Sequence, residues 1–293
     1  MRILLLGANG QLGFELRRVL ERHDVVAATR STFDIADPSI EEKIVACKPQ
    51  VVIHSAAFTK VDDAEANPEL AMRVNSDGTK WVARGTARAK ARLVYISTDY
   101  VFDGTQSEPY KETDRTNPLN VYGRSKLKGE QEAFAECPRS LIVRTSWVYG
   151  AHGHNFVNTI LKLSLQMPEL RVVNDQHGSP TYAYDLAVAI EALIYRGVSG
   201  LIHAGGEGFC SWYDFACEII RLAGRSCQVI PIATSESGRL AARPPFSALS
   251  TSRLHLYGLT LPTWRDGLER FIDECRRNQM RDDAFALQKS ANR

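Results

Sequence analysis

Tyr122 and Lys126 stand four residues apart in a segment whose pattern predicts a helix, so their side chains share one helical face. Asn117 and Pro118 precede them and predict the helix start, because proline is tolerated in a first turn. An ammonium beside a phenol favours the phenolate and should lower the tyrosine pKa from about 10 towards neutral pH. The pair is therefore a candidate acid and base. An exposed pair without a role is the alternative, but of the ten tyrosines only Tyr122 has a lysine four residues later.

A second candidate site lies near the N-terminus, where residues 2–6 form an apolar run typical of a strand buried on both faces. Glycines then recur as Gly-x-x-Gly-x-x-Gly, and an amphipathic helix is predicted from there to Arg22. Such glycines allow a tight turn and let backbone N–H groups approach a pyrophosphate. The turn predicts a dinucleotide site, with a glycine turn that binds nothing as the alternative. The expected contacts are Gly7, Asn9, Gly10, Gln11, Leu12 and Gly13.

Arg30 ends the next predicted strand, residues 24–29. NAD-specific sites usually carry an acid at this position to bind the ribose 2′-hydroxyl. A cation suits the 2′-phosphate of NADPH instead, so NADPH is the expected cofactor and NADH a second candidate. A surface arginine without a ligand is the alternative. Asp34 and Ile35, which follow, are also expected to contact the cofactor.

Predicted strands and helices alternate through the first half, which indicates βαβ units. The further strands are predicted over residues 51–55, 93–97 and 141–145, and a long helix over residues 68–91. We therefore expect an α/β fold, a Rossmann-type doubly wound parallel sheet that binds ligands at the carboxyl ends of its strands. His54 lies within a strand and is interpreted as a packed histidine. The residues expected at the ligand edge are Ala56, Ala57, Ser97, Thr98, Asp99, Ser146 and Trp147.

The second half is less regular and predicts a smaller lobe. Residues 1–150 are expected to form an NAD(P)-binding domain, 151–280 a substrate-binding lobe with one or two strands returning to the main sheet, and 281–293 a polar tail. Ser211 is a predicted helix N-cap. His152-Gly153-His154 is interpreted as a loop, because no third ligand stands at metal spacing. Helices are predicted over 155–166, 182–196 and 266–277, and strands over 170–173 and 201–203.

The composition argues against several classes of protein. A net charge of +2 over 293 residues gives no reason to expect nucleic acid or an anionic membrane as a partner. No apolar run approaches the roughly 18 residues of a membrane span, and the N-terminus does not resemble a signal peptide. The six cysteines include no CxxC pair, so we expect thiols in a reducing cytoplasm.

Several motifs together carry a resemblance to a known family. The glycine turn, Asn75, Ser97-Thr98-Asp99 and the Tyr122/Lys126 pair resemble the extended short-chain dehydrogenase/reductases, and within them the dTDP-4-dehydrorhamnose reductases. The similarity runs from residue 1 to about residue 278. The longer matching stretches are residues 97–104, 118–123, 144–149, 174–181 and 242–245.

The resemblance implies NAD(P)H-dependent reduction of the C4 ketone of dTDP-4-dehydro-6-deoxy-L-mannose to dTDP-L-rhamnose. Tyr122 would donate the proton, Lys126 would bind the nicotinamide-ribose hydroxyls, and Thr98 would hydrogen-bond the ketone oxygen. The implied cofactor contacts also include Ala56, Ala57, Phe58, Asn75, Tyr122 and Lys126. The implied substrate contacts are Thr98, Asp99, Tyr122 and Trp147.

Arg243, in a loop rich in proline and arginine, is the best candidate for an anchor of the substrate diphosphate, because a guanidinium binds phosphate oxygens two at a time. A solvated surface arginine is the alternative. Members of the family can also hold Mg²⁺ between subunits through carboxylates on the first helix and on the helix after residue 181. Glu15 is present, but Tyr184 stands where an acid is expected, with Asp185 beside it. No metal ligand is therefore assigned.

The expected partners are a small-molecule nucleotide sugar and, at most, a second copy of the chain in a homodimer. Two other functions stay open. One is a related nucleotide-sugar enzyme, either a 4-ketoreductase of different stereochemistry or an epimerase or dehydratase. A dehydratase is disfavoured, because it would need a carboxylate pair where this chain has Thr98-Asp99-Tyr100. The other is a non-catalytic regulatory subunit, which would have no need of a tuned phenol.

Overall fold

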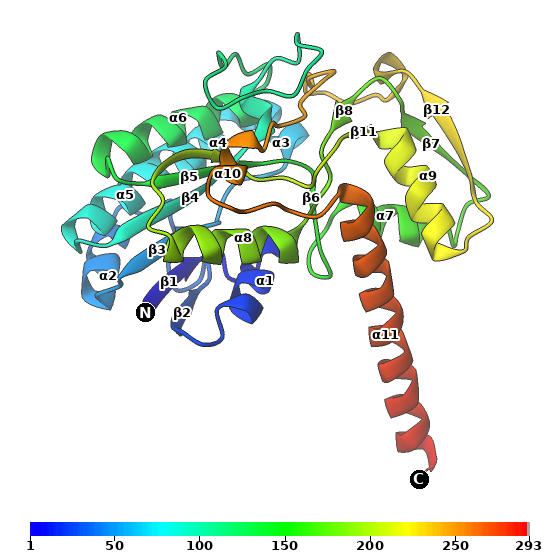
Figure 1. Cartoon of the computed structure of the whole chain (residues 1–293), viewed down its shortest axis with the longest axis horizontal. Coiled ribbons are helices and arrows are strands. Elements are labelled where there is room, and N and C mark those ends of the chain that lie inside the picture. Colours follow the sequence, from blue (N-terminus) through cyan, green and yellow to red (C-terminus); the bar gives the residue numbers. More distant parts are fainter. Residues whose placement is uncertain (292–293) are drawn as a thin grey trace.

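Six parallel strands form the central sheet of the computed structural model, which describes the backbone of residues 1–291 and the side chains of residues 1–278 (Figure 1). Their order is β10-β5-β4-β3-β1-β2, and each neighbouring pair is parallel. From β1 the chain first adds β2 on one side and then crosses to add β3 on the other. This change of direction opens a crevice at the carboxyl ends of β1 and β3. The predicted doubly wound fold is confirmed. The strands are β1 (Arg2–Leu6), β2 (Asp24–Ala28), β3 (Val51–His54), β4 (Arg92–Thr98), β5 (Leu141–Thr145) and β10 (Gly200–His203).

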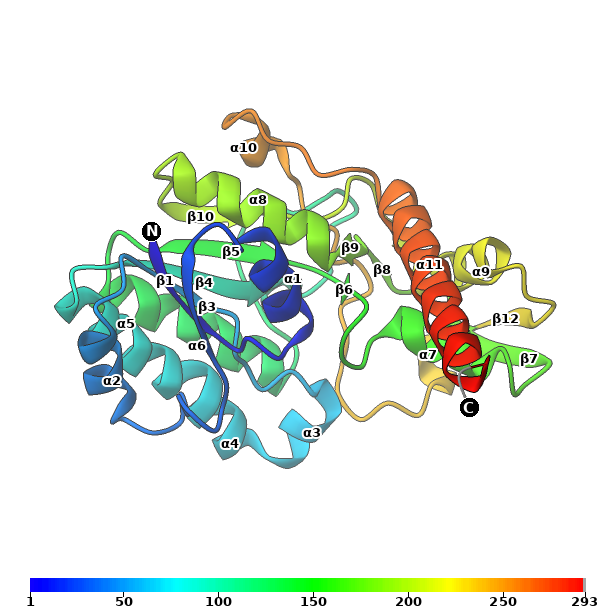
Figure 2. The ribbon, with the colours of Figure 1, turned by 90° about the horizontal axis from the view of Figure 1, so that it is seen from below.

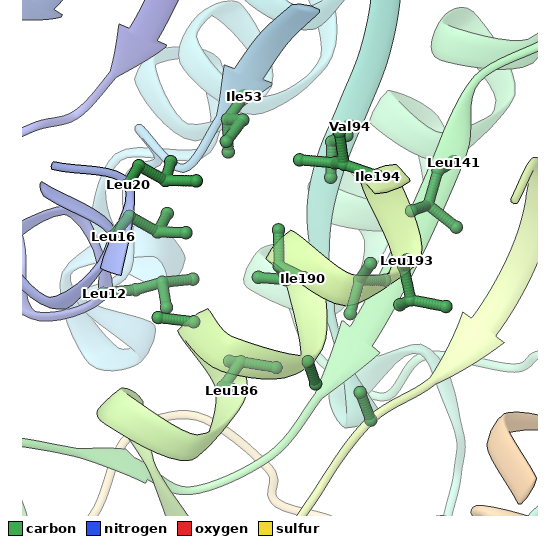
Figure 3. Packing of buried hydrophobic residues seen from close by; sticks show 14 of the residues in the cluster. Leu12, Leu16, Leu20, Ile53, Val94, Leu141, Leu186, Ile190, Leu193 and Ile194 are labelled. Carbon is green, nitrogen blue, oxygen red and sulfur yellow. The ribbon is translucent and has the colours of Figure 1, made fainter. Parts of the chain in front are cut away.

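Helices cover both faces of the sheet (Figure 2). On one face α1 (Gln11–Val19) packs against α8 (Ala183–Tyr195), and on the other α5 (Gly78–Arg88) lies between α2 (Ile40–Cys47) and α6 (Val121–Glu136). Figure 3 shows the first interface, where Leu12 and Leu16 face Leu186 and Ile190 above the sheet. α8 and β10 therefore return from the second half of the chain to complete the main layer.

Side chains alternate along β4, which passes through the middle of the sheet. Val94 and Ile96 pack into the core beneath α1 and α8, whereas Tyr95 and Ser97 face α6. This period of two follows from the pleat of a strand. Consecutive residues at the end of β4 therefore enter different environments.

The long helix predicted over residues 68–91 is built from three consecutive pieces. These are α4 (Pro68–Met72), a π-helical turn over Arg73–Asp77, and α5. Asn75 lies in the π-helical turn, a kind of helix distortion that is frequent at functional sites. The short helix α3 (Val61–Ala66) precedes them.

The rest of the second half forms a smaller lobe beside the carboxyl edge of the sheet (Figure 1). Its core gathers around Phe215, Phe271 and Tyr149, which are all buried. The paired strands are β6 (Val148–Tyr149) with β9 (Thr181–Tyr182), β7 (Glu169–Val173) with β12 (Gln228–Ile232), and β8 (His177–Gly178) with β11 (Cys210–Ser211). Its helices are α7 (Phe156–Leu163), α9 (Trp212–Ala223) and α11 (Trp264–Ala291), whereas α10 (Ser252–His255) packs against β10 of the main sheet.

Several predicted helix ends differ from the structure, among them those of α6, α1 and α11. α6 begins at Val121 rather than at Asn117–Pro118, because the Asn120 side chain accepts a hydrogen bond from the Gly123 N–H at 2.7 Å and caps the helix there. α1 ends at Val19, before Arg22. α11 continues to Ala291 instead of ending at Arg277, since no glycine or proline interrupts that stretch. Of the predicted tail, residues 292–293 lie outside the described part of the chain.

The Ser211 cap is confirmed, because its hydroxyl and the Asp214 carboxylate close a capping box at the start of α9. Over the residues described, no helix has the length and apolarity needed to cross a bilayer.

Candidate active site

The glycine turn between β1 and α1 brings backbone close to backbone. Gly7 has φ +83°, which favours glycine, and a Cβ there would lie 2.7 Å from the Ala56 nitrogen. A Cβ at Gly13 would lie 2.1 Å from the Gly7 carbonyl oxygen. Only glycine therefore fits this turn, and no side chain caps the N-terminus of α1. Its unpaired N–H groups and positive dipole end suit a phosphate.

A cavity of about 1020 Å³ runs from this turn along the carboxyl edge of the sheet. Its walls come from the segments that follow β1, β2, β3, β4 and β5, together with the first turns of α6. Such a cavity is at the upper end of the usual range for ligand sites, about 300–1,000 Å³. The expected residues on its wall are Gly7, Asn9, Gly10, Gln11, Leu12, Gly13, Arg30, Asp34, Ile35, Ala56, Ala57, Phe58, Thr98, Asp99, Tyr122, Lys126 and Trp147.

These residues fit a dinucleotide cofactor. The wall combines the phosphate-binding turn with buried donors that retain unused hydrogen-bonding capacity. The Thr145 hydroxyl is buried on the wall without a protein partner. The Lys126 ammonium has three protons and donates one of them, to the Ile96 carbonyl at 2.7 Å. Its other protons are available to ligand hydroxyls.

Helix α6 places Tyr122 and Lys126 at the cavity. The Asn120 cap fixes the first turn, and Gly123 allows close approach because a Cβ there would lie 2.1 Å from the Tyr100 carbonyl oxygen. The Lys126 nitrogen also lies 4.0 Å from the centroid of the Tyr95 ring, a cation–π contact. Carbonyl and ring together hold the buried ammonium in place.

The prediction that Lys126 lowers the pKa of Tyr122 is wrong for this structure. Burial raises the pKa of Tyr122 to about 12, partly offset by interaction with the Thr98 side chain. Burial also lowers the pKa of Lys126 to about 7, against the opposing charge of Glu130. Desolvation therefore sets the direction of both shifts. Tyr122 is a phenol that retains its proton at neutral pH and can donate it.

Thr98 and Asp99 lie at the end of β4 in contact with each other. The Thr98 hydroxyl donates to Asp99 Oδ1 at 3.1 Å and accepts from the Tyr100 N–H at 3.2 Å. Asp99 Oδ2 accepts from the Ser247 hydroxyl at 2.6 Å. Burial raises the pKa of Asp99 to about 7, although these hydroxyls and nearby backbone N–H groups oppose the rise.

Trp147 has a left-handed backbone, with φ +46°. Such a conformation is strained for a bulky residue and persists only where its surroundings impose it. Its ring stacks on Trp212, with 3.4 Å between centroids and 5° between planes. A Cβ on Gly178 would lie 2.4 Å from the indole, so that glycine gives the ring its space. Trp147 is thus a fixed wall of the cavity.

Two expected contacts, Asn75 and Arg243, are not on the cavity wall. Asn75 exchanges two hydrogen bonds with the Phe58 backbone, at 2.8 and 3.0 Å, and donates a third to Ser125. It therefore ties the segment after β3 to α6. Arg243 donates to both Asp62 oxygens, at 3.1 and 2.8 Å, and its side chain is 11% exposed. The ion pair links the smaller lobe to the first turn of α3.

Sequence reasoning missed some residues at the site. Gly153 and His154 line the cavity, and Gln11 Nε2 donates to the His154 carbonyl at 3.2 Å, so their loop lies over the glycine turn. Ser247 and Trp212 support Asp99 and Trp147 from far along the chain. No local pattern marks these residues, because their role depends on how the smaller lobe docks.

The carboxylates considered for magnesium are each paired with an arginine. Glu15 pairs with Arg18 at 2.8 Å, and Asp185 binds Arg270 through two hydrogen bonds of 2.8 and 2.6 Å. Among the described residues no cluster of three or more His, Cys, Asp or Glu side chains could hold a metal. Arginines balance the charges of both acids. His54 is buried and hydrogen-bonds the Thr79 hydroxyl, and burial, with a smaller contribution from the Lys126 charge, lowers its pKa to about 3.

Comparison with known proteins identifies close relatives over nearly the whole chain. The profile of the RmlD substrate binding domain family matches residues 1–277. The dTDP-4-dehydrorhamnose reductase of Mycobacterium tuberculosis is 43% identical over 277 residues, covering 91% of each chain. Spore coat polysaccharide biosynthesis protein SpsK of Bacillus subtilis is 41% identical over 276 residues, covering 93% of this chain and 97% of its own.

A solved structure extends the similarity to three dimensions. The dTDP-4-dehydrorhamnose reductase of Bacillus anthracis in complex with NADP superposes with a TM-score of 0.91 at 43% sequence identity, covering 93% of this chain and 99% of its own. Its bound NADP agrees with the dinucleotide cavity described above.

Proposed function

The chain belongs to the RmlD substrate binding domain family, and from this premise we propose that it reduces the C4 ketone of dTDP-4-dehydro-6-deoxy-L-mannose with NADPH, forming dTDP-L-rhamnose. The observation that carries the proposal is one continuous cavity that joins a phosphate-binding glycine turn to Thr98, Tyr122 and Lys126. The relatives named dTDP-4-dehydrorhamnose reductase, one of them solved with NADP, support the substrate and the cofactor.

NADPH, when bound, supplies the hydride that reduces C4. The chain supplies the proton and the positioning. Because the pKa of Tyr122 is raised to about 12, the phenol is protonated at neutral pH. It donates this proton to the alkoxide oxygen as negative charge develops there. Lys126, fixed by the Ile96 carbonyl and the Tyr95 ring, directs its remaining protons to ribose hydroxyls. Donors placed in advance around the developing charge lower the barrier without further reorganisation.

The substrate side of the cavity is assigned to Thr98, Asp99 and Trp147. Trp147 cannot rotate away, because Trp212 and Gly178 hold its ring, so it bounds the space next to Tyr122. Arg243 is assigned to the diphosphate end through the loop it holds, since its guanidinium is paired with Asp62.

We further assign the reaction to the cytoplasm, supported by the free state of all six cysteines. A homodimer stays a prediction.

The test is NADPH oxidation by the purified protein with dTDP-4-dehydro-6-deoxy-L-mannose as substrate. We expect oxidation that depends on this sugar, with dTDP-glucose, which has no ketone, as the inactive control. Product analysis by NMR should show the rhamno configuration at C4. Oxidation no faster than with dTDP-glucose would contradict the proposal, and the other C4 epimer would indicate a sister ketoreductase.

A further inference from the structure

The Thr98 hydroxyl has a single proton, and the structure directs it away from the substrate. A hydroxyl can accept two hydrogen bonds but donate only one. Here the oxygen accepts from the Tyr100 N–H, and the proton is donated to Asp99 Oδ1. While this bond exists, Thr98 has no proton for a ketone oxygen in the cavity.

Asp99 is placed so that its own proton would reverse this arrangement. Its carboxyl group is 2% exposed, its Oδ2 is bound by the Ser247 hydroxyl, and its Oδ1 faces Thr98. A proton on Oδ1 would make Asp99 the donor and Thr98 the acceptor. Thr98 would then accept from both Tyr100 and Asp99, and its proton would be free to point to the side of the cavity where Tyr122 lies.

We propose that Asp99 is a positioning residue for the reduction: in its protonated form it donates to Thr98 and thereby directs the Thr98 proton to the ketone oxygen. The inference rests on the proposed function, since it needs a ketone in the cavity. Asp99 itself transfers no proton in the step. The proton that ends on the new hydroxyl comes from Tyr122, and Asp99 only determines the orientation of the second donor.

The surroundings of Asp99 allow both forms near neutral pH. Burial raises its pKa to about 7, so the protonated form is populated there and is lost as the pH rises further. The titratable groups that face this corner are Tyr100 on the same turn, Tyr122 and Lys126 on α6, and Arg243 beside Tyr100. Lys126 also titrates at about 7 because of its burial. The pH profile of the wild type alone therefore cannot identify the group.

Asp99→Asn separates the two groups, because asparagine has the hydrogen-bonding pattern of the protonated acid. Its oxygen can accept from Ser247 while its Nδ2 donates to Thr98. The experiment measures kcat against pH for wild type, Asp99→Asn, Asp99→Ala and Thr98→Val, with saturating NADPH and sugar. A hydrogen bond to a developing charge is worth about ten- to a hundredfold in rate.

In wild type we expect kcat to fall with rising pH above about 7 and to approach the level of Thr98→Val. Asp99→Asn should retain activity near neutral pH and lose most of this alkaline decline. Asp99→Ala should stay low at every pH. The proposal is overturned if Asp99→Asn keeps the full alkaline decline, which would then belong to Lys126, or if it is as impaired as Asp99→Ala throughout.

A second measurement does not need turnover. A carboxyl group whose pKa is raised on folding stabilises the protein below its unfolded value, about 3.9, and this contribution is lost as the pH rises through the folded value. As the pH rises from acidic to alkaline, the urea midpoint of wild type should therefore fall relative to that of Asp99→Asn. A difference between the two midpoints that does not change with pH overturns the proposal. If wild type shows no sugar-dependent NADPH oxidation, the proposed function is wrong and the proposal fails with it. A working wild type with an unaltered decline in Asp99→Asn overturns the proposal alone.

Discussion

Ser97 and Thr98 are consecutive residues of β4, yet they belong to buried polar clusters of opposite kinds. Ser97 donates to Glu130 at 2.5 Å, and Arg144 binds the same carboxylate through hydrogen bonds of 2.8 and 2.7 Å. Glu130 and Arg144 therefore balance each other's charge. On the other side of the strand, Thr98 contacts Asp99 and Tyr122, and the largest influence on the pKa of each of those two groups is burial.

The difference shows how one scaffold separates stability from chemistry. The ion pair, with side chains 4% and 5% exposed, forms between two protein groups, although the buried Arg144 Nη1 has no hydrogen-bond partner. In the second cluster burial raises the pKa of Tyr122 to about 12 and that of Asp99 to about 7, so Tyr122 keeps a proton for the substrate and Asp99 is partly protonated near neutral pH. Tyr122, Lys126 and Glu130 recur every four residues along α6. One face of α6 thus carries the proton donor Tyr122 in its first turn and the ion-paired Glu130 near its middle.

The largest expected effect follows from removing the proton donor of the reactive cluster. Tyr122→Phe should lower kcat by about a hundred- to ten-thousandfold, the range for a positioned general acid. NADPH affinity, measured by fluorescence titration, should change little. Tyr100→Phe is the matched control for kcat, since its ring centroid lies 5.9 Å from that of Tyr122 and it does not line the cavity; because its hydroxyl interacts with Arg243, any effect should appear in KM for the sugar. Near-wild-type turnover of Tyr122→Phe would remove the tyrosine from the mechanism.

Removing Glu130 from its buried ion pair with Arg144 should mainly reduce stability, and it should also lower the pKa of Lys126 further, because the Glu130 charge raises that pKa. Glu130→Ala leaves Arg144 buried without its counter-charge and should lower the free energy of unfolding by about 3–5 kcal/mol. Replacing both partners by Met should recover most of that loss. Glu236→Gln, which breaks an ion pair with Arg171 that is 49% and 59% exposed, is the control and should cost about 1 kcal/mol or less in urea unfolding. Equal effects at the two sites would contradict the distinction.

The same contrast explains which parts could be predicted from the sequence. The strands, the glycine turn and the Tyr122/Lys126 spacing depend on local pattern, and the structure places that pair at the cavity. The direction of the Tyr122 pKa shift could not be predicted, because it depends on burial and on the Ile96 carbonyl that holds Lys126. Trp147 was expected at the edge, but its strained backbone depends on Trp212, which lies 65 residues later.

The ion pair between Arg243 and Asp62 lies at the border of the active site, and substitutions at both residues test what it does. Arg243→Met should raise KM for the nucleotide sugar roughly tenfold, the loss of one charge-assisted interaction, and leave KM for NADPH nearly unchanged. Asp62→Asn decides how it acts. If Arg243 holds its loop through Asp62, both variants should raise KM alike. If it binds the diphosphate directly, Asp62→Asn should leave KM nearly unaltered. Arg239, 62% exposed and 3.4 Å from the same Asp62, is the control and its change to Met should have little effect.

Arg30 also pairs with an aspartate, but unlike Arg243 it is exposed, and its substitution should have the smallest effect on activity. Its side chain is 82% exposed on the cavity wall, and its Nε lies 3.5 Å from Asp34 Oδ2, a pair that water and salt weaken. It is therefore available to the 2′-phosphate of NADPH, and Arg30→Ala should lower kcat/KM for NADPH by about tenfold or less.

Asp34 supplies the matched control for this pair. If Arg30 faces the 2′-phosphate, its removal should leave kcat/KM for NADH nearly unchanged, and the difference between the cofactors should shrink as salt is added. Asp34→Ala should act in the opposite sense, weakening NADH, whose free 2′-hydroxyl needs an acceptor, more than NADPH. Equal losses with both cofactors in Arg30→Ala would mean that the arginine supports the turn after β2 and does not select the cofactor. The exposed pair of Arg30 and Asp34 affects activity only through the cofactor that it contacts, so the size of the effect must depend on whether NADPH or NADH is bound.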